Sequence, residues 1–392
     1  MKSDWYSSTI GEVCSVVTDG SHFSPPSVQN GEYMVSVKDF TEYGFDFSNC
    51  RKISANDYEQ LAKNGCVPQK GDVLVGKDGA RYFEDIIIYK QLERPALLSS
   101  IAILRANPAL ITPEFLYYTL KTPNVKKDVR ENYGSGSAIP RIVLKDFRRM
   151  PISFPSVHNQ ERITCLFQRI DDKIELNKRI NENLEQQSQA LYEKLCMSYS
   201  TGPLVSLADL MDYAGGSQPP ASQFIYEEKV GYIRFVQIRD YDSDSHLTYI
   251  PESPRNKLCE EHDIMIARYG ASLGRICSGL NGAYNVALAK VYPKEQCYRE
   301  FLRCYLSSRE FYEGINNKGG RSAQAGFNQS DIKSFELILP DKSALIQFEG
   351  IAASLFEQRL NLKKENMKLA LLRDSLLPKL MSGELDVSNI DI

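Results

Sequence analysis

The stretch GDVLVGKDGARYF at residues 71–83 has a near copy, HDIMIARYGASLG, at residues 262–274. In both copies an Asp precedes alternating apolar residues, then a cation, then a glycine that lies seven residues after the Asp. One match of this kind is expected by chance. Whether this stretch decides the fold therefore depends on whether the rest of the chain repeats in step with it.

Several further stretches recur in the same order, at offsets of about 185 to 200 residues. VKDF at 37–40 corresponds to IRDY at 238–241, and PEFLYYTL at 113–120 corresponds to REFLRCYL at 299–306. The offset changes slowly along the chain, as insertions and deletions in loops would produce. The sequence therefore predicts two tandem copies of one unit.

Each copy is followed by a long stretch nearly free of proline and glycine, in which apolar residues recur at three-, four- or seven-residue spacings. This pattern predicts a long amphipathic helix with a coiled-coil seam. The simplest partner for each helix is the other one, in an antiparallel pair. The predicted seam residues are Ile163, Phe167, Ile170, Ile174, Leu184 and Leu191 in the first helix, and Phe348, Leu355, Leu362, Leu369 and Leu376 in the second.

Polar residues interrupt both seams near their midpoints: Asn177 and Asn181 in the first helix, Gln358 and Glu365 in the second. In an antiparallel pair these positions face each other, and a polar layer there would fix the register. The alternative is that these side chains are simply exposed on the outside of the supercoil.

The predicted fold class is α+β, with two similar α/β globular units, each followed by a long helix, and the two helices paired. The predicted boundaries are 1–155 and 201–340 for the globular units, 156–200 for the first helix, and 341–392 for the second helix and tail. Within the units, GDVLVGK and HDIMIAR predict half-buried strands. PEFLYYTL and REFLRCYL predict helix starts.

Bulk properties exclude several classes of protein. A chain of 392 residues exceeds one compact core, and 42% hydrophobic with 25% charged residues is typical of a soluble globular protein. No apolar run approaches about 18 residues, and the N-terminus lacks a signal-peptide core, so we expect a cytoplasmic protein without membrane contact. Nine cysteines without C-x-x-C spacing and four histidines without ligand spacing predict neither disulfides nor a metal site.

The net charge of −3 hides a local basic cluster. Residues 121–149 contain eight basic and three acidic side chains, a local charge of +5. In both copies of the opening stretch, moreover, a strand carries a cation (Lys77 or Arg268) to a glycine that permits a tight turn. Such an arrangement suits contact with phosphates or base edges. The alternatives are a solvated basic face and a surface hairpin with incidental cations.

Taken together, the repeat, the paired helices and the GDxL motif at residues 71–74 resemble the specificity subunit of type I restriction–modification systems over the whole chain. FPSVHNQERI, which leads into the first helix, and LLPKLMSGEL, which ends the second, add to the resemblance. The second copy departs from the motif, since Glu261-His262 stands where the first has Lys70-Gly71.

The resemblance implies two target-recognition domains, each binding one half of a split double-stranded DNA sequence, with the helices setting the gap. It also implies two methyltransferase subunits and restriction/translocase subunits as partners. S-adenosylmethionine, ATP and Mg²⁺ are expected on those partners, with no cofactor on this chain.

The residues that we predict to bind DNA follow from loop position and chemistry. The phosphate candidates are Lys38, Lys77, Lys126, Lys127, Arg141, Arg239 and Lys318. The base-reading candidates are Arg81, Arg268, Arg275, Arg321 and Gln324. Any of these side chains could instead form a structural ion pair.

Recognisable catalytic motifs are absent from the sequence, including a G-x-x-x-x-G-K-[ST] loop and G-x-G-x-x-G after a strand. We therefore predict no catalytic residue on this chain. Three alternatives stay open: a tandem-repeat protein–protein scaffold that does not bind DNA, an enzyme with an unrecognised site, and the specificity subunit of a methylation-only system.

Overall fold

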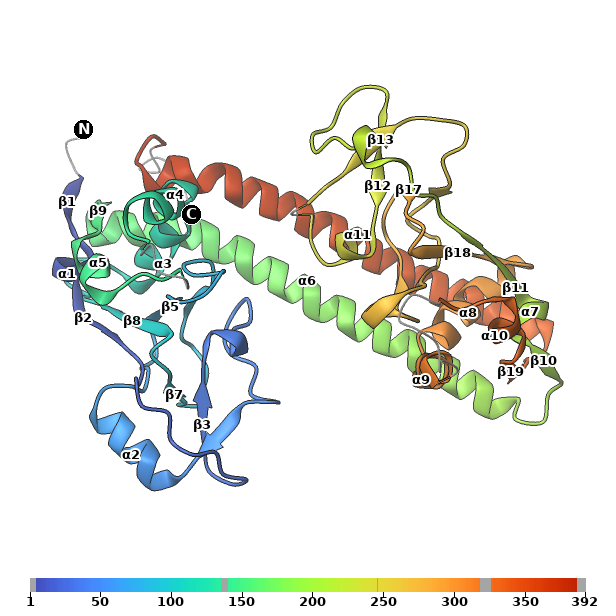
Figure 1. Cartoon of the computed structure of the whole chain (residues 1–392), viewed down its shortest axis with the longest axis horizontal. Coiled ribbons are helices and arrows are strands. Elements are labelled where there is room, and N and C mark those ends of the chain that lie inside the picture. The colour runs from blue at the N-terminus through green and yellow to red at the C-terminus, as the bar shows by residue number, and fades with distance from the viewer. Residues whose placement is uncertain (1–4, 135–139, 245, 318–325, 386–392) are drawn as a thin grey trace. The chain divides into compact units, whose positions relative to one another are not determined.

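The computed structural model describes residues 5–134, 140–244, 246–317 and 326–385. The chain forms two compact units, unit 1 from residues 1–174 with 367–392, and unit 2 from residues 175–366. Helix α6 is Val157–Ser198 and helix α11 is Lys342–Met381, so each long helix contributes to both units. Each unit therefore combines a globular part with one stretch of each helix (Figure 1).

Unit 1 contains a four-stranded antiparallel sheet in the order β2-β8-β5-β6 and a three-stranded sheet in the order β4-β3-β7. In the second sheet β3 and β7 run parallel. Strand β1 pairs with β9, which brings the start of the globular part beside its end. The strands are β1 (Tyr6–Thr9), β2 (Cys14–Asp19), β3 (Glu32–Val35), β4 (Arg51–Ile53), β5 (Val73–Gly76), β6 (Ile86–Ile88), β7 (Ala96–Leu97), β8 (Ile101–Ala106) and β9 (Pro151–Phe154).

Two helices of unit 1, α2 and α3, start at residues whose side chains cap them. Helix α3 has Pro113 in its first turn, and the hydroxyl of Thr112 accepts a hydrogen bond from the Phe115 backbone N–H at 3.1 Å. The helix start predicted from PEFLYYTL is thus confirmed. The helices are α1 (Ile10–Val13), the 3₁₀ turn η1 (Val37–Asp39), α2 (Ala55–Lys63), α3 (Pro113–Lys121), α4 (Pro123–Asn132) and α5 (Leu144–Arg149).

Unit 2 has the same plan. Its sheets follow the orders β11-β18-β15-β16 and β13-β12-β17-β14, and β10 pairs with β19. Strands β12 and β17 run parallel, as β3 and β7 do in unit 1. The strands are β10 (Leu204–Ser206), β11 (Met211–Gly215), β12 (Tyr232–Val236), β13 (Tyr249–Pro251), β14 (Leu258–Cys259), β15 (Met265–Ala267), β16 (Ile276–Cys277), β17 (Gly282–Tyr284), β18 (Leu288–Pro293) and β19 (Glu336–Ile338).

Helical elements also correspond between the units. The predicted helix start REFLRCYL is helix α8, the counterpart of α3, and the turn at IRDY is η3, the counterpart of η1. The order and directions of the first four-stranded sheet and the parallel pair of the second sheet recur in unit 2, so the predicted duplication is confirmed. The second sheet of unit 2 has one further strand, β14. The elements are α7 (Leu207–Leu210), η2 (Ala221–Gln223), η3 (Ile238–Tyr241), η4 (Gly270–Ser272), η5 (Gln296–Tyr298), α8 (Arg299–Leu306), α9 (Arg309–Asn317) and α10 (Gln329–Lys333).

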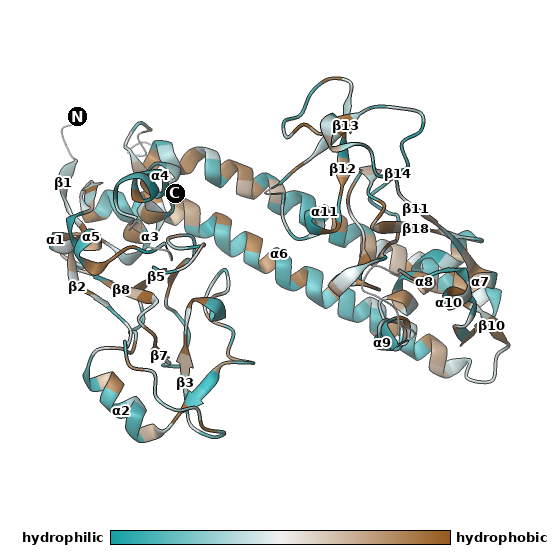
Figure 2. Ribbon diagram, viewed as in Figure 1, coloured by the Kyte–Doolittle hydropathy of each residue, from teal (hydrophilic) through white to brown (hydrophobic). Residues whose placement is uncertain are grey.

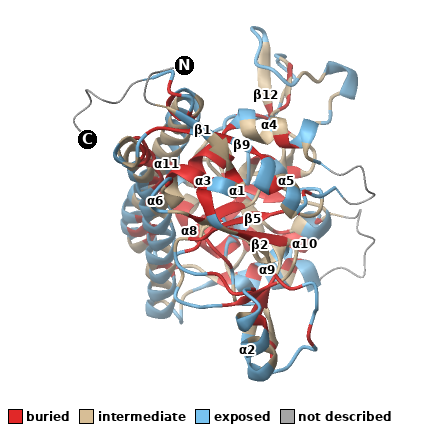
Figure 3. Ribbon diagram, turned by 90° about the vertical axis from the view of Figure 1, so that its left-hand side faces the viewer, coloured by how far each residue is buried: buried red, intermediate tan, exposed pale blue. Residues whose placement is uncertain are grey.

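The two strands of the opening stretches lie at the centre of their units. All four residues of β5 are buried, and Figure 3 shows β5 and α3 in the buried colour. Val73 and Val75 belong to one apolar cluster, and Leu74 belongs to another on the opposite side of the strand. The prediction of half-buried strands is therefore wrong, because both faces of the central strand are covered.

In unit 1, the start of α6 packs against the end of α11. Ile163 and Phe167 share one apolar cluster with Leu377 and Leu380. A polar contact continues the pairing, since the Arg373 guanidinium donates to an Asp171 carboxylate oxygen at 2.8 Å.

In unit 2, the remaining parts of the two helices pair in opposite directions. Glu185 is bonded to Arg359 at 2.9 Å, and further along α6 the Tyr192 ring lies 6.5 Å from the Phe348 ring, centroid to centroid. Residue numbers fall along α11 as they rise along α6, so the predicted antiparallel arrangement is confirmed.

The polar layer is also present within unit 2. Asn177 is fully buried, and its amide nitrogen donates to Glu365 Oε2 and to Asn366 Oδ1, both at 2.8 Å. The Asn181 amide oxygen is buried as well, without a hydrogen-bond donor among the described residues. Gln358 is exposed and takes no part in the layer, so that element of the prediction is wrong.

The seam prediction holds better for α6 than for α11. Ile163, Phe167, Ile170, Ile174 and Leu184 are buried, and Leu191 is partly buried. In α11 Phe348 is buried, but the leucines predicted at strict seven-residue spacing are only partly covered: Leu355, Leu362, Leu369 and Leu376.

The buried residues of α11 have a spacing of three or four residues instead of seven. They are Leu345, Phe348, Ala352, Phe356 and Leu360. A straight helix drifts by about 20° per heptad from an exact seven-residue repeat, so the covered stripe moves off the leucine row. Figure 2 shows apolar and polar bands alternating along both helices.

Candidate nucleic-acid interface

The aspartate of the repeated motif is an anchor for the turn before the central strand. Asp72 accepts a hydrogen bond from the Gln69 backbone N–H at 2.7 Å, and Arg105 donates to both of its carboxylate oxygens at 2.8 Å. Only 1% of Asp72 is exposed. Gly71, with φ of 94°, makes the turn in a conformation that favours glycine.

Unit 2 repeats this anchor with different partners. Asp263 accepts from the Glu260 backbone N–H at 2.7 Å and is bonded to Lys290 at 2.6 Å. Arg105 and Lys290 were not among the residues predicted from the sequence. The sequence nevertheless contains a signal for this pair, because both residues are basic and they lie 185 residues apart, at the offset of the repeat.

After each central strand the chain turns at a glycine with positive φ. Gly79 has φ of 94° and Gly270 has φ of 68°. A Cβ at either position would meet no other atom, so backbone conformation alone accounts for the glycine. Each turn closes with a hydrogen bond to the glycine carbonyl, from Tyr82 N–H at 3.0 Å and from Leu273 N–H at 3.1 Å. The structure thus brings the predicted cations to one equivalent turn in each unit.

The two strand-end cations are in different environments. Lys77 is 6% exposed and lies 3.2 Å from a carboxylate oxygen of Asp19. This buried ion pair engages its charge inside the protein, which disfavours the predicted role as a phosphate ligand.

Arg268 has no carboxylate within ion-pair distance among the residues that the structure describes. Its guanidinium lies over the rings of Tyr269, at 5.1 Å, and Phe327, at 5.8 Å. Its Nε is buried without an acceptor. The guanidinium is therefore held by aromatic packing rather than by an ion pair with a described residue.

The two loop arginines that follow are engaged in surface pairs. Arg81 is bonded to Asp85 at 2.7 Å, and Asp85 raises the pKa of Arg81. Arg275 donates two hydrogen bonds to Asp242, at 2.8 and 2.6 Å, and these hold the pKa of Asp242 below its ordinary value. Surface pairs of this kind are worth only about 0–1 kcal/mol, so a phosphate or base edge can replace the carboxylate.

The basic cluster at 121–149 is partly neutralised. Lys126 and Arg130 both contact the carboxylate of Glu84, and burial, followed by repulsion from Lys121, lowers the pKa of Lys126. Lys127 is exposed and lies 3.9 Å from Glu131. The alternative that these residues form a solvated basic face, and not a DNA contact, therefore explains much of the cluster.

Other predicted cations lie close to the turn of unit 1. Arg141 is exposed, and its segment is joined to the turn by hydrogen bonds from Gly79 N–H to Pro140 O at 2.9 Å and from Ile142 N–H to Lys77 O at 3.0 Å. The structure thereby places Arg141 beside the segment that carries Arg81.

The two cations of the 3₁₀ turns occupy matching positions. Lys38 in η1 is exposed, and so is Arg239 in η3, with 54% of its side chain accessible and a carboxylate oxygen of Asp240 at 3.8 Å. Lys318, Arg321 and Gln324 lie outside the described residues. For all twelve candidates, DNA contact stays a prediction.

No metal cluster of three or more His, Cys, Asp or Glu occurs in the described part of the chain. All nine cysteines are free. Among the described helices, none combines the length and apolar character that crossing a membrane requires.

Comparison with known proteins shows which families the chain resembles. Residues 2–186 match the family described as type I restriction modification DNA specificity domain. The chain is 24% identical over 308 residues to the MjaIX specificity subunit of Methanocaldococcus jannaschii, covering 71% of each protein. It is 20% identical over 468 residues to the HindI specificity subunit of Haemophilus influenzae, covering 98% of this chain and 100% of that one. Residues 2–186 belong to the type I restriction–modification DNA specificity domains, and the whole chain is similar to specificity subunits.

The fold agrees with that membership. The crystal structure of the S subunit of a type I restriction–modification system from M. genitalium matches with a TM-score of 0.60, at 16% identity and over 97% of each chain. The resemblance inferred from the repeat is confirmed. As a specificity subunit, the chain is the DNA-recognising, non-catalytic member of its system.

Proposed function

We propose that each globular part of this specificity subunit recognises one half of a split double-stranded DNA target through the major groove. Helices α6 and α11 fix the number of base pairs between the halves. They also dock two methyltransferase subunits, which carry S-adenosylmethionine. Restriction/translocase subunits, with ATP and Mg²⁺, complete the complex where the system restricts DNA.

The single observation that carries this proposal is the duplication. Two globular parts that share the order and directions of their first sheet are built onto one antiparallel helix pair. Two copies of one fold suit two separate half-sites. The helices contain 42 and 40 residues, and each is roughly 60 Å long at about 1.5 Å per residue, more than one turn of B-DNA at about 34 Å.

The local geometry favours Arg268 for base recognition in unit 2. Its guanidinium lies over the Tyr269 ring and has no carboxylate partner among the described residues, so little side-chain freedom is lost on binding. Arg binding two acceptors of guanine is the commonest specific contact in the major groove. In unit 1 the buried Lys77 does not offer the same group, and the exposed Arg141 and Arg81 are the corresponding candidates.

Substitution of Arg268 tests the assignment of half-sites. Once the target is known, we expect Arg268→Ala to weaken binding to duplexes by about 1–3 kcal/mol through one half-site, and to relax discrimination at one base pair in that half. Arg309→Ala is a matched control, since Arg309 lies in the same unit with 87% of its side chain exposed and is paired with Glu313. Equal weakening on all sequences, including scrambled half-sites, would contradict a base-reading role.

Exchange of a whole unit tests the modular claim. Replacing residues 1–155 with the corresponding part of another specificity subunit should change one half of the methylated sequence and leave the other half and the gap unchanged. A change in both halves would show that the units do not recognise DNA independently.

The scaffold alternative makes a different prediction about salt. If phosphates are neutralised on binding, log K falls linearly with log salt at a slope of about −0.9 per phosphate contact. A protein–protein scaffold would show no DNA affinity and hence no such slope. A methylation-only system differs only in the other subunits, so purification of the complex separates it from a restricting one.

A further inference from the structure

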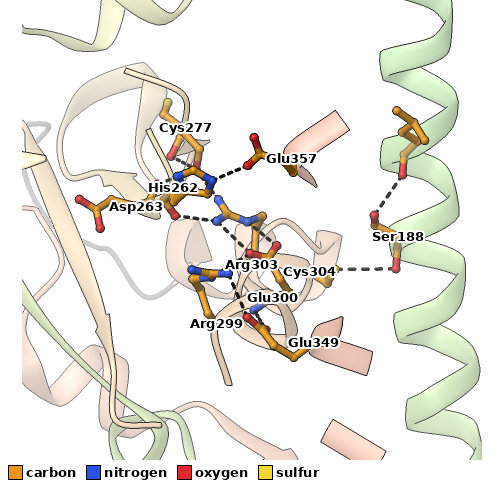
Figure 4. Close-up of polar contacts among 12 residues, drawn as sticks. Ser188, His262, Asp263, Cys277, Arg299, Glu300, Arg303, Cys304, Glu349 and Glu357 are labelled. Carbon is orange, nitrogen blue, oxygen red and sulfur yellow. Dashed lines mark hydrogen bonds and ion pairs between the residues drawn. The ribbon is translucent and has the colours of Figure 1, made fainter. Parts of the chain in front are cut away.

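Unit 2 contains a polar cavity that shares only Arg275 with the predicted DNA contacts. It has a volume of about 270 Å³ and lies between α6, α8, β16 and α11. Ser188 of α6, Cys277 of β16, and Arg303 and Cys304 of α8 form part of its wall, and Figure 4 shows these side chains together. At about 30 Å³ per water molecule, this volume holds a small ion with several waters, or a small organic phosphate.

The cavity carries one positive charge more than its ion pairs balance. Three arginines line it, and each is already paired with one carboxylate. The pairs are Arg275 with Asp242 at 2.6 Å, Arg303 with Glu300 at 2.7 Å, and Arg359 with Glu185 at 2.9 Å. Lys363 also lines the cavity and makes no ion pair with any residue in the described ranges.

Two further donors in the wall lack acceptors. The Nε of Arg359 and the hydroxyl of Tyr241 are both buried without a hydrogen-bond partner within the described part of the chain. Arg303, by contrast, is fully engaged, with hydrogen bonds to Glu300, Ser278 and the His262 carbonyl. A buried polar atom without a partner is uncommon, and two such donors beside an unpaired ammonium indicate that an acceptor is missing.

The surroundings suit an anion. Burial raises the pKa of Cys277 to about 11 and that of Cys304 to about 12, so both thiols are neutral near pH 7 and do not repel a negative charge. Lys363 keeps access to solvent, while the protein around it, followed by Arg359, lowers its pKa. A bound anion would offset that repulsion between cations.

We propose that this cavity binds a phosphate group, held by Lys363, the Nε of Arg359 and the hydroxyl of Tyr241. Two of these donors come from α11 and one from η3. A tetrahedral oxyanion presents oxygens in several directions and matches such an arrangement, whereas a carboxylate presents two oxygens in one plane. The phosphate is either a free phosphate or phosphomonoester, or a backbone phosphate of bound DNA.

Calorimetric titration of the full chain tests the proposal, with inorganic phosphate as the probe and sodium chloride and sodium acetate at matched ionic strength as references. We expect saturable binding of phosphate alone. Lys363→Gln and Tyr241→Phe should each weaken it about tenfold, since each removes one hydrogen bond to a charged group. Both variants should fold, because neither group makes an ion pair or hydrogen bond among the described residues.

Lys364→Gln is the matched control, because Lys364 is the next residue of α11 but is bonded to Glu261 at 2.8 Å and lies outside the cavity wall. It should bind phosphate as the unmodified chain does. Absence of saturable binding, equal binding of acetate, or an equal loss in Lys364→Gln would each overturn the proposal.

Repeating the titration on the DNA-bound complex separates the two sources. Retained phosphate binding supports a free ligand, whereas displacement with the same dependence on Lys363 supports a backbone phosphate. The result for the chain without DNA does not depend on the proposed half-site recognition, so either claim can fail alone.

Discussion

The buried aspartate in front of the central strand gives the sharpest prediction of stability. Asp72→Ala removes three hydrogen bonds, two from Arg105 and one from the Gln69 backbone, at a position that is 1% exposed. Breaking a buried ion pair costs about 3–5 kcal/mol. Because 30% of the Arg105 side chain is exposed and can be hydrated, we expect a value near the lower limit, about 3 kcal/mol.

The repeat supplies a matched control for this substitution. Asp263→Ala removes one contact with Lys290 and one backbone hydrogen bond, and 21% of the Asp263 side chain is already exposed. We therefore expect only about 1–2 kcal/mol in unit 2. Comparing the two variants tests whether the burial of the aspartate, rather than the presence of the motif, determines how much free energy of unfolding is lost.

Hydrogen exchange of the full chain, followed by mass spectrometry, assigns each effect to its unit. A loss of about 3 kcal/mol should speed exchange in β5 roughly 100-fold in Asp72→Ala, with β15 unchanged. Asp263→Ala should speed exchange in β15 by roughly tenfold. A loss below about 1 kcal/mol in Asp72→Ala, or equal effects of the two substitutions, would refute the reasoning.

Three further substitutions probe the helix pair and its caps. Asn177→Asp places a buried carboxylate against Glu365 and should lower the free energy of unfolding by about 3 kcal/mol at pH 7. This penalty should shrink near pH 4.5, because one of the two carboxyl groups is then protonated. A midpoint of urea unfolding that does not depend on pH would contradict this. Asp341 caps α11 by accepting from Ala344 N–H at 2.9 Å, and this and its other hydrogen bonds lower its pKa to about 2. Its stabilising effect should be complete above about pH 4 and be lost as the pH falls toward 2, a dependence that carboxyl NMR should show and that Asp341→Asn should remove. Phe167→Ala should cost about 3–5 kcal/mol in thermal unfolding, because the ring is fully buried; a change under 1 kcal/mol would contradict its place in the core.

The duplication and the long helices were predictable because each depends on a pattern repeated many times. A seam of apolar residues on α6 stands out from spacing alone, and the antiparallel pairing follows from the need to bury it. The exact covered stripe on α11 was not predictable, since Leu355 and Leu362 keep the heptad while the helix itself rotates away from it. Burial of Phe356 and Leu360 in their place depends on packing.

Whether an individual cation is paired with a carboxylate inside the protein was much less predictable. Lys77 and Arg268 occupy equivalent positions, but of the two only Lys77 meets a carboxylate among the residues that the structure describes, because Asp19 ends β2 in unit 1 while β11 ends at Gly215. A single residue on another strand of the same sheet, distant in sequence, thus decides whether the charge is used internally. The alternation in β5 was misleading for a related reason, since its second face is covered by residues outside the strand, such as Val35 and Phe45.

Mapping the methylated bases of a genome in cells that express this chain with its methyltransferase subunits tests the central claim most directly. We predict one split motif, with two specified halves and an unspecified gap of constant length, methylated at nearly every occurrence. A continuous motif, or halves separated by gaps of variable length, would contradict the account of two recognition units held at a fixed distance.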